Sequence, residues 1–256
     1  MTREELRGMS STIDDLMDLG REEEAEKLLT EALQASADDE AYHLFFQAES
    51  AYYLENDYRT REQLLAKGLR AAPDDAFLLR NMGGGHLMKK RHSKARRHFE
   101  KALEAEPHDI DTLRCLGLLN SARGRESKAR KWFQQALAID PEDNDSLRQI
   151  GVSYSKLGKD EEAIVWYKKA LEYCSQDYDA MRQMGISIAM LGDYELALTW
   201  LNRALEVNPG DRDTTRNIWL VKQKQSGKGT SFIDVIMIRL ARKFTLAWRR
   251  FIDRFG

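Results

Sequence analysis

The feature that most constrains the fold of this sequence is an interval of 34 residues. Gly117, Gly151 and Gly185 are spaced by that interval, and other small or acidic residues recur with it. These residues are Ala95, Ala129, Ala163 and Ala197; Ala102, Ala136, Ala170 and Ala204; and Asp75, Asp109, Asp143, Asp177 and Asp211. A fixed interval of this length predicts a stack of similar units, because one such unit cannot bury its apolar residues alone.

Each interval contains two stretches in which apolar residues recur at helical spacing. In one copy they are Leu147, Ile150, Gly151 and Tyr154, followed by Ala163, Tyr167, Ala170 and Leu171. Gly158 lies between the two stretches, where a helix end favours a residue that tolerates the left-handed conformation. A turn closes each unit, and Asp can cap the helix that follows it. The pattern predicts paired helices that approach closely at their small residues.

This pattern closely resembles the tetratricopeptide repeat. In one copy the signature reads Leu113, Leu116, Gly117, Asn120, Ala129, Phe133, Ala136 and Pro141; the next copy has Ser175 in place of the proline. The resemblance implies an all-α fold, a right-handed superhelical solenoid of antiparallel helix pairs. It also implies a protein that binds other proteins, since most repeats of this family do so; the fold itself does not identify the partner.

The signature divides the chain into five predicted segments. Residues 1–41 form acidic helices and a degenerate repeat, and 42–211 form five repeats. Residues 212–225 form a capping helix, 226–231 a flexible linker, and 232–256 a basic amphipathic helix. The first of the five repeats matches the signature least well, because three of its small-residue positions hold other residues. They are Glu49 and Arg61, and Gly68 where the other repeats have alanine.

The residue arrangements that the sequence lacks exclude several classes of function. No Ser–His–Asp, Cys–His or paired-carboxylate arrangement is present, so we predict no catalytic residue, no metal ligand and no cofactor. Cys115 and Cys174 lie in different repeats and are typical of reduced thiols, which favours a cytoplasmic protein. Nucleic acid is an unlikely partner, because no aromatic residues interleave with the basic residues between Lys89 and Arg97.

Charge is distributed unevenly along the chain, although the net charge is only −2. Residues 1–60 contain 16 acidic and 5 basic residues, whereas residues 226–256 contain 2 acidic and 7 basic residues. The two ends could attract each other within one molecule or in self-association. Alternatively, these charges only keep exposed helices soluble.

A periodic set of polar residues is the candidate binding site. An arginine stands three residues before each repeat glycine, an amide usually follows it, and both continue beyond the last repeat. The set comprises Arg80, Asn81, Arg114, Arg148, Gln149, Arg182, Gln183, Arg216 and Asn217. In the family that the sequence resembles, the first helix of each repeat lines a concave groove, so these residues would bind a peptide there. Alternatively, each arginine pairs with the aspartate three residues earlier, such as Asp145.

Residues 232–252 have one apolar and one basic helical side. The apolar side includes Ile233, Ile236, Leu240, Phe244, Trp248 and Phe251, and the basic side Arg239, Arg242, Lys243, Arg249 and Arg250. Cations near the middle argue against a membrane span. Three alternatives remain: an anionic membrane surface, a protein partner or second copy, and packing onto the repeats.

These observations predict a non-enzymatic scaffold or adaptor that binds a protein or peptide partner in the groove of the repeats. The alternative is a peripheral membrane adaptor anchored by residues 232–252 at the inner face of a membrane.

Overall fold

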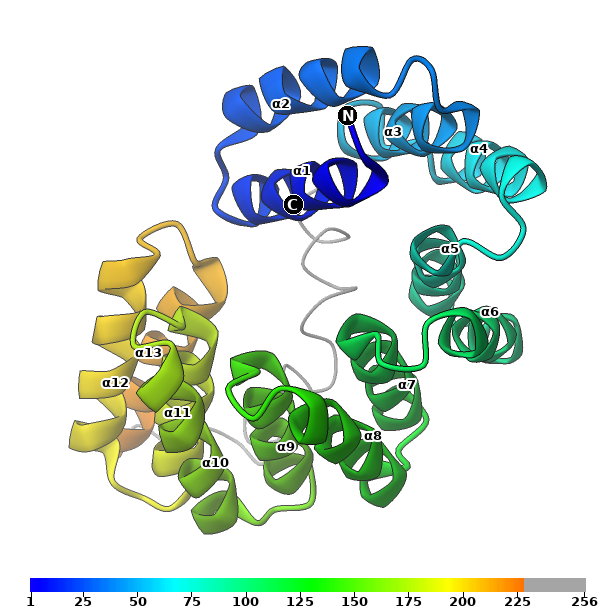
Figure 1. Ribbon diagram of the computed structural model, residues 1–256. Coiled ribbons are helices and arrows are strands. Elements are labelled where there is room, and N and C mark those ends of the chain that lie inside the picture. The colour runs from blue at the N-terminus through cyan, green and yellow to red at the C-terminus, as the bar shows by residue number, and fades with distance from the viewer. Residues whose placement is uncertain (228–256) are drawn as a thin grey trace. The chain divides into compact units, whose positions relative to one another are not determined.

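The computed structural model describes residues 1–227; residues 228–256 lie outside the described part. Residues 1–227 form thirteen α-helices and no β-strand (Figure 1), which confirms the predicted all-α fold. The helices are α1 (Arg3–Asp18), α2 (Glu22–Ala35), α3 (Glu40–Tyr53), α4 (Tyr58–Ala71), α5 (Ala76–Met88), α6 (His92–Ala105), α7 (Ile110–Ala122), α8 (Glu126–Ile139), α9 (Asn144–Lys156), α10 (Asp160–Tyr173), α11 (Tyr178–Met190), α12 (Tyr194–Val207) and α13 (Arg212–Gln225).

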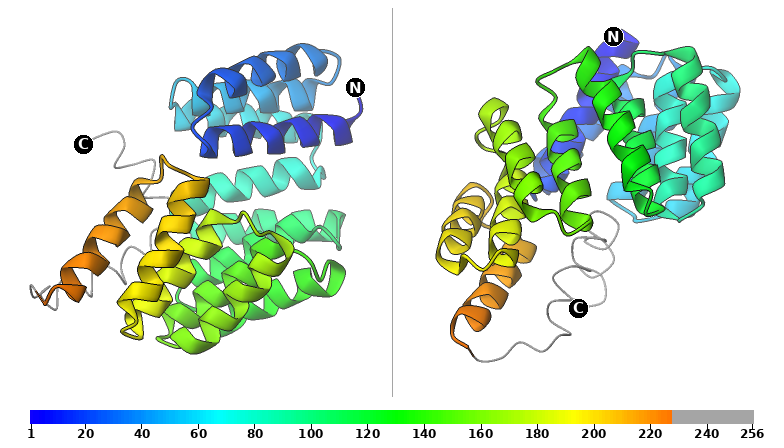
Figure 2. Two further views of the ribbon diagram at one scale, coloured as in Figure 1. Left: turned by 90° about the vertical axis from the view of Figure 1, so that its left-hand side faces the viewer. Right: turned by 90° about the horizontal axis from the view of Figure 1, so that it is seen from below.

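The chain divides into two compact units, Met1–Cys115 and Leu116–Gly256. In the first unit each helix from α1 to α5 contacts the next one along the chain, and short loops join them (Figure 2). In the second unit α11 contacts both α9 and α13, while α10 packs on α9 and α11, and α12 on α11 and α13. We call the row formed by α9, α11 and α13 the first-helix layer.

The repeat glycines allow the helices of a pair to approach closely. A Cβ atom on Gly151 would lie 2.5 Å from the Tyr167 ring, and one on Gly83 would lie 2.5 Å from the Phe99 ring. Real Cβ atoms do not come so near another atom, so these two helix pairs require glycine. The close approach that the sequence predicts at Gly151 is therefore confirmed.

The turn glycines adopt the left-handed conformation that the sequence predicts. Gly124, Gly158 and Gly192 have φ of 71°, 75° and 96°. The corresponding positions of two earlier repeats hold Asn56 and Lys90, with φ of 57° and 55°. The helix pair thus turns in the same way in all five repeats, whether or not glycine is present.

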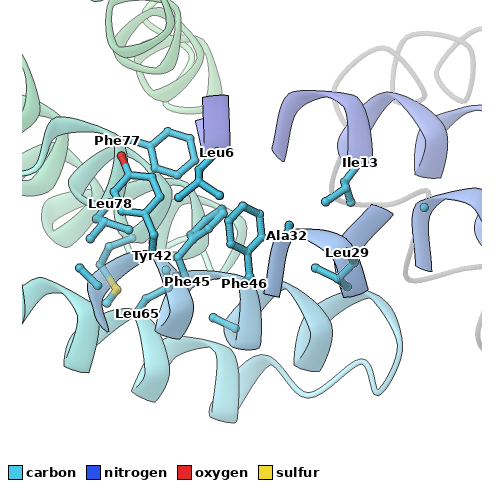
Figure 3. Close-up of a cluster of buried hydrophobic side chains, with 14 residues drawn as sticks. Leu6, Ile13, Leu29, Ala32, Tyr42, Phe45, Phe46, Leu65, Phe77 and Leu78 are labelled. Atoms are coloured by element: carbon cyan, nitrogen blue, oxygen red, sulfur yellow. The ribbon is translucent and has the colours of Figure 1, made fainter. Parts of the chain in front are cut away.

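The first unit is held together by an aromatic cluster (Figure 3). The Phe77 ring lies edge-on to Phe45 at 4.8 Å between centroids and stacks on Tyr42 at 5.7 Å. Leu6 from α1 and Leu65 from α4 are buried in the same cluster. Leu29 from α2 belongs to it too, so five helices share one core, in which large aromatic side chains supply much of the buried apolar area.

The repeat over residues 42–75 differs from the signature at residues that compensate for one another. Glu49 and Arg61, which replace the glycine and alanine of other repeats, form a buried ion pair at 2.8 Å. Arg61 needs space from the next repeat, since a Cβ on Gly85 would lie 3.2 Å from its Nη1 atom. Gly85 is thereby explained, whereas a Cβ on Gly84 would meet nothing within 4 Å. Gly68 also avoids a tight contact, because its Cβ would lie 3.0 Å from the carbonyl oxygen of Ala41.

Candidate protein-binding surface

The arginines of the candidate site pair with carboxylates of the following repeat. Arg80 Nη1 donates to Asp109 at 2.8 Å, Arg148 Nε to Asp177 at 3.1 Å, and Arg182 Nη1 to Asp211 at 2.6 Å. In each case the aspartate lies 29 residues after the arginine and at the start of the next first helix. These contacts connect one repeat to the next, and the helical spacing of the sequence did not predict them.

Two of these aspartates are also helix caps. Asp177 accepts a hydrogen bond from the Ala180 backbone N–H at 2.9 Å, and Asp211 accepts one from that of Asp213 at 3.2 Å. A carboxylate at a helix N-terminus stabilises the helix through this bond and through the helix dipole. One side chain thus begins a helix and binds it to the repeat before it.

Ion pairs within one helix are also present, as the alternative interpretation of the arginines predicts. Arg114, Arg148 and Arg182 each donate to the aspartate three residues earlier, namely Asp111, Asp145 and Asp179. Burial opposes the charge of Arg148, but the carboxylates of Asp177, Asp179 and Asp145 outweigh it and raise the pKa of the guanidinium above its ordinary value. These arginines are therefore part of a carboxylate network and also candidates for binding.

Exposure divides the predicted site residues into two groups. Arg182, Gln183 and Asn217 are buried, with 3 %, 4 % and 7 % of their surface exposed, which differs from the expectation of a ligand-facing row. Arg80, Asn81, Arg114, Arg148 and Gln149 are half-buried, and Arg216 is exposed. Asn81 donates to the Phe77 carbonyl at 3.0 Å. Gln149 and Arg216 are the members of this set whose side chains remain open to solvent and make no hydrogen bond to other groups of residues 1–227.

An apolar row accompanies the polar one and was missed in the sequence. Leu118, Val152, Ile186 and Leu220 follow the amide positions by three residues and are 34 residues apart. Val152, Ile186 and Leu220 belong to one buried cluster, to which α9, α11 and α13 all contribute. Their common interval was the signal that could have revealed them. On α7, α9, α11 and α13 an apolar residue thus stands four residues after the arginine, about one helical turn away.

The described residues offer little support for metal binding, for nucleophilic catalysis or for a membrane span. Residues 1–227 contain no group of three His, Cys, Asp or Glu side chains placed to hold a metal ion. Burial raises the pKa of the Cys115 thiol to about 11, so this thiol is protonated and weakly nucleophilic at neutral pH. None of the described helices is long and apolar enough to cross a membrane.

The second predicted site lies outside the described residues. It comprises the apolar and basic sides of residues 232–252, on which the membrane alternative depends. That alternative stays a prediction from the sequence.

Comparison with known proteins identifies the repeats. Residues 74–142 and 146–177 match family models described as tetratricopeptide repeat. The fold resembles that of TTC0263, a thermophilic TPR protein in Thermus thermophilus, with a TM-score of 0.62 and 18% identity over 71% of this chain and 98% of that one. It also resembles a chain of the APC/C hetero-tetramer Cut9–Hcn1, with a TM-score of 0.64 and 16% identity over 85% of this chain and 46% of that one. No curated protein matches the chain. At these identities the likeness to solved structures shows the fold.

Proposed function

Because the chain is a tetratricopeptide-repeat protein, we propose that it is a non-enzymatic scaffold that binds a protein or peptide partner through its first helices. The observation that carries the proposal is the pair of rows on these helices. One row holds arginines and amides, and the other holds branched apolar side chains at the same interval. An extended peptide could hydrogen-bond to the first row while its apolar side chains contact the second.

In the second unit the proposed contact residues are Arg148, Gln149, Val152 and Leu118. The carboxylates around Arg148 fix its guanidinium in place, so that little rotamer entropy would be lost when a ligand binds. Gln149 is half-exposed and can both donate and accept a hydrogen bond. In the first unit Arg80 and Asn81 hold the corresponding positions on α5.

A binding experiment on the full chain tests the proposal. A peptide selected from a random library on the purified protein serves as the probe, and its affinity is measured by calorimetry. Leu118→Asp places a charge at the half-buried member of the apolar row, and Gln149→Ala removes the amide. Each should weaken binding by about tenfold or more, or about 1.4 kcal/mol.

Lys168→Ala is the matched control, because Lys168 is exposed on α10 in the second-helix row. It should leave the affinity unchanged. Equal affinities for wild type, Leu118→Asp and Gln149→Ala would reject the first-helix surface as the binding site.

A further inference from the structure

The first described helix, α1, and the last, α13, each expose a side that is buried in α11. Within the first-helix layer, α11 has a neighbour on either side, α9 and α13, and all its residues from Ala180 to Ala189 are buried. A stack of repeats buries such sides against the next unit. The contacts of α11 therefore indicate what the exposed sides of α1 and α13 can bind.

The exposed side of α1 corresponds to the side of α11 that contacts the preceding repeat. Gly8 stands twelve residues before the turn glycine Gly20, as Ala180 stands twelve before Gly192. Ala180 is buried with Ala170 of the preceding second helix, whereas Gly8 is exposed and a Cβ there would meet nothing within 4 Å. Glycine inside a helix is unfavourable relative to alanine, and no contact in the described chain requires it here.

This side of α1 is acidic. Asp15 corresponds in the same way to Ser187 of α11, whose hydroxyl hydrogen-bonds at 3.3 Å to that of Ser155 on the preceding first helix. The two arginines of α1 pair with carboxylates of the first unit and do not neutralise it. Residues four and seven apart share one side of a helix. We call this exposed set the outer side of α1; it comprises Glu4, Gly8, Ser11 and Asp15.

The exposed side of α13 is basic and contains a large apolar residue. Arg216 stands 34 residues after Arg182, which pairs with the aspartate 29 residues later. The residue 29 positions after Arg216 is Thr245, which offers no carboxylate. Trp219 lies about one turn from Arg216 and is 58 % exposed. We call this exposed set the outer side of α13; it comprises Arg212, Arg216, Trp219 and Lys222.

We propose that the protein binds a second copy of itself, with the outer side of α13 in one copy packed on the outer side of α1 in the other. The indole of Trp219 would lie against Gly8. Large rings already pack on glycines within the repeats, where a Cβ on Gly151 would lie 2.5 Å from the Tyr167 ring. An exposed glycine with open space around it is the matching surface for an exposed indole.

Charge favours contact between these two unlike sides. Helix α13 contains four basic residues and one acidic residue, whereas α1 contains five acidic and two basic residues. Arg216 and Lys222 would face Glu4 and Asp15, and none of these four side chains is buried. Two α13 sides or two α1 sides would repel each other, so the contact is heterologous and each copy keeps one outer side for a further copy.

This inference goes beyond the proposed function and does not depend on it. The outer sides of α1 and α13 contain neither Gln149 nor Leu118 of the proposed peptide-binding surface. Each associated copy would add another such surface, so that a partner carrying several binding motifs would bind with avidity.

Sedimentation velocity of the full-length protein from about 1 to about 100 μM tests the inference. The wild-type protein should sediment as a monomer at the lowest concentration and as larger species at the highest. Trp219→Ala removes the indole, and Gly8→Arg places a bulky cation opposite the basic side of α13. Each should weaken association about tenfold or more. Val165→Ala is the matched control, because Val165 is a 53 % exposed apolar residue on α10, and it should associate like wild type.

A mixture of the two variants tests the pairing of unlike sides. Trp219→Ala keeps an intact α1 side, and Gly8→Arg keeps an intact α13 side. At a concentration where each variant alone is a monomer, their equimolar mixture should form a pair through one contact. Thermal melting checks that each variant is folded.

A monomeric wild type at the highest concentration, or a mixture that stays monomeric, would overturn the inference. Association of Trp219→Ala or Gly8→Arg as tight as that of wild type would overturn it as well. So would hydroxyl-radical labelling of Trp219 that is low at every concentration, because another part of the same chain would then cover this residue. If association fails but Leu118→Asp still weakens peptide binding, the proposed function stands without it.

Discussion

Glu49 and Arg61 show how two unfavourable residues become compatible when they occur together. Each replaces a small residue at a helix contact, and each would leave a buried charge without the other. Arg61 also lies over the Tyr52 ring at 4.8 Å, which helps to compensate for its desolvation. A buried pair of this kind contributes modestly as a pair, but removing one partner is costly.

We predict that Arg61→Ala lowers the free energy of unfolding by about 3–5 kcal/mol, because Glu49 is left charged and buried. The double variant Glu49→Gly/Arg61→Ala restores the signature of the repeat and should lose less than the two single variants together. Urea denaturation of the four proteins gives the coupling energy. Arg21→Ala, which breaks the exposed pair with Glu24, is the control and should resemble wild type. Additive losses in the double variant would contradict the prediction.

His86 should make stability depend on pH. It is buried on α5, and burial, followed by the nearby His98, lowers the pKa of its imidazole. Its Nδ1 atom lies 3.9 Å from Glu62, which also pairs with Lys89 and Arg91, and Lys94 is a further cation facing it. The unfolded chain therefore binds a proton more readily than the folded one, so stability rises with pH.

The contribution should be fully present above the ordinary imidazole pKa of about 6.5 and should be lost as the pH falls below it. Denaturation at a series of pH values from about 5 to 8 measures this loss. His86→Gln should flatten the dependence, whereas His108→Gln, at an exposed turn residue, should not. An identical slope in His86→Gln and wild type would refute the assignment.

Among the elements, the first helices depend on their predecessors as well as on their own caps. Asp177 caps α11 and also binds Arg148 of the repeat before it, whereas Asp193 caps α12 and pairs with no arginine of residues 1–227. Both aspartates are helix caps, but Asp177 also accepts hydrogen bonds from Arg148 and Asn144 of the preceding repeat.

We expect Asp177→Ala to lower the free energy of unfolding by about 2–4 kcal/mol, from loss of the cap and of a bond to a charged group. Asp193→Ala should cost only about 0.5–2 kcal/mol, the usual loss for a cap. Chemical denaturation of both variants measures the difference. Equal losses would show that the bonds of Asp177 to Arg148 and Asn144 contribute nothing to stability.

The helices could be predicted from sequence more completely than their polar contacts. Gly151, Tyr167 and Gly158 lie in a local pattern with a steric meaning, so they fix a helix pair and its turn. The partner of Arg148 could not be found in this way, because helical spacing shows only the neighbours on the same helix, such as Asp145. Asp177 comes close to Arg148 only through the packing of one repeat on the next.

At the scale of the whole molecule, the binding surface was predicted incompletely because it, too, depends on the packing of one repeat on the next. The arginine and amide row was visible because its members are chemically unusual, whereas Val152 and Ile186 resemble ordinary core residues. The burial of Gln183 depends on the packing of α11 among its neighbouring helices, which no local pattern shows. The fold recurs in every repeat and therefore leaves many signals in the sequence. The partner that binds a surface leaves few.

Asp177, which caps a helix and also pairs with Arg148, has a consequence for how the number of repeats can increase. Residues 144–177 contain both Arg148 and Asp177, so this segment carries the arginine and the carboxylate of its own connection. An additional copy inserted after residue 177 would bring a complete connection with it and leave the neighbouring ones intact. An insertion between residues 148 and 177 would instead lengthen the segment that joins the arginine to its carboxylate. Duplication of a whole 34-residue unit is therefore the mutation that this architecture tolerates. The array can lengthen by such duplications, one repeat at a time.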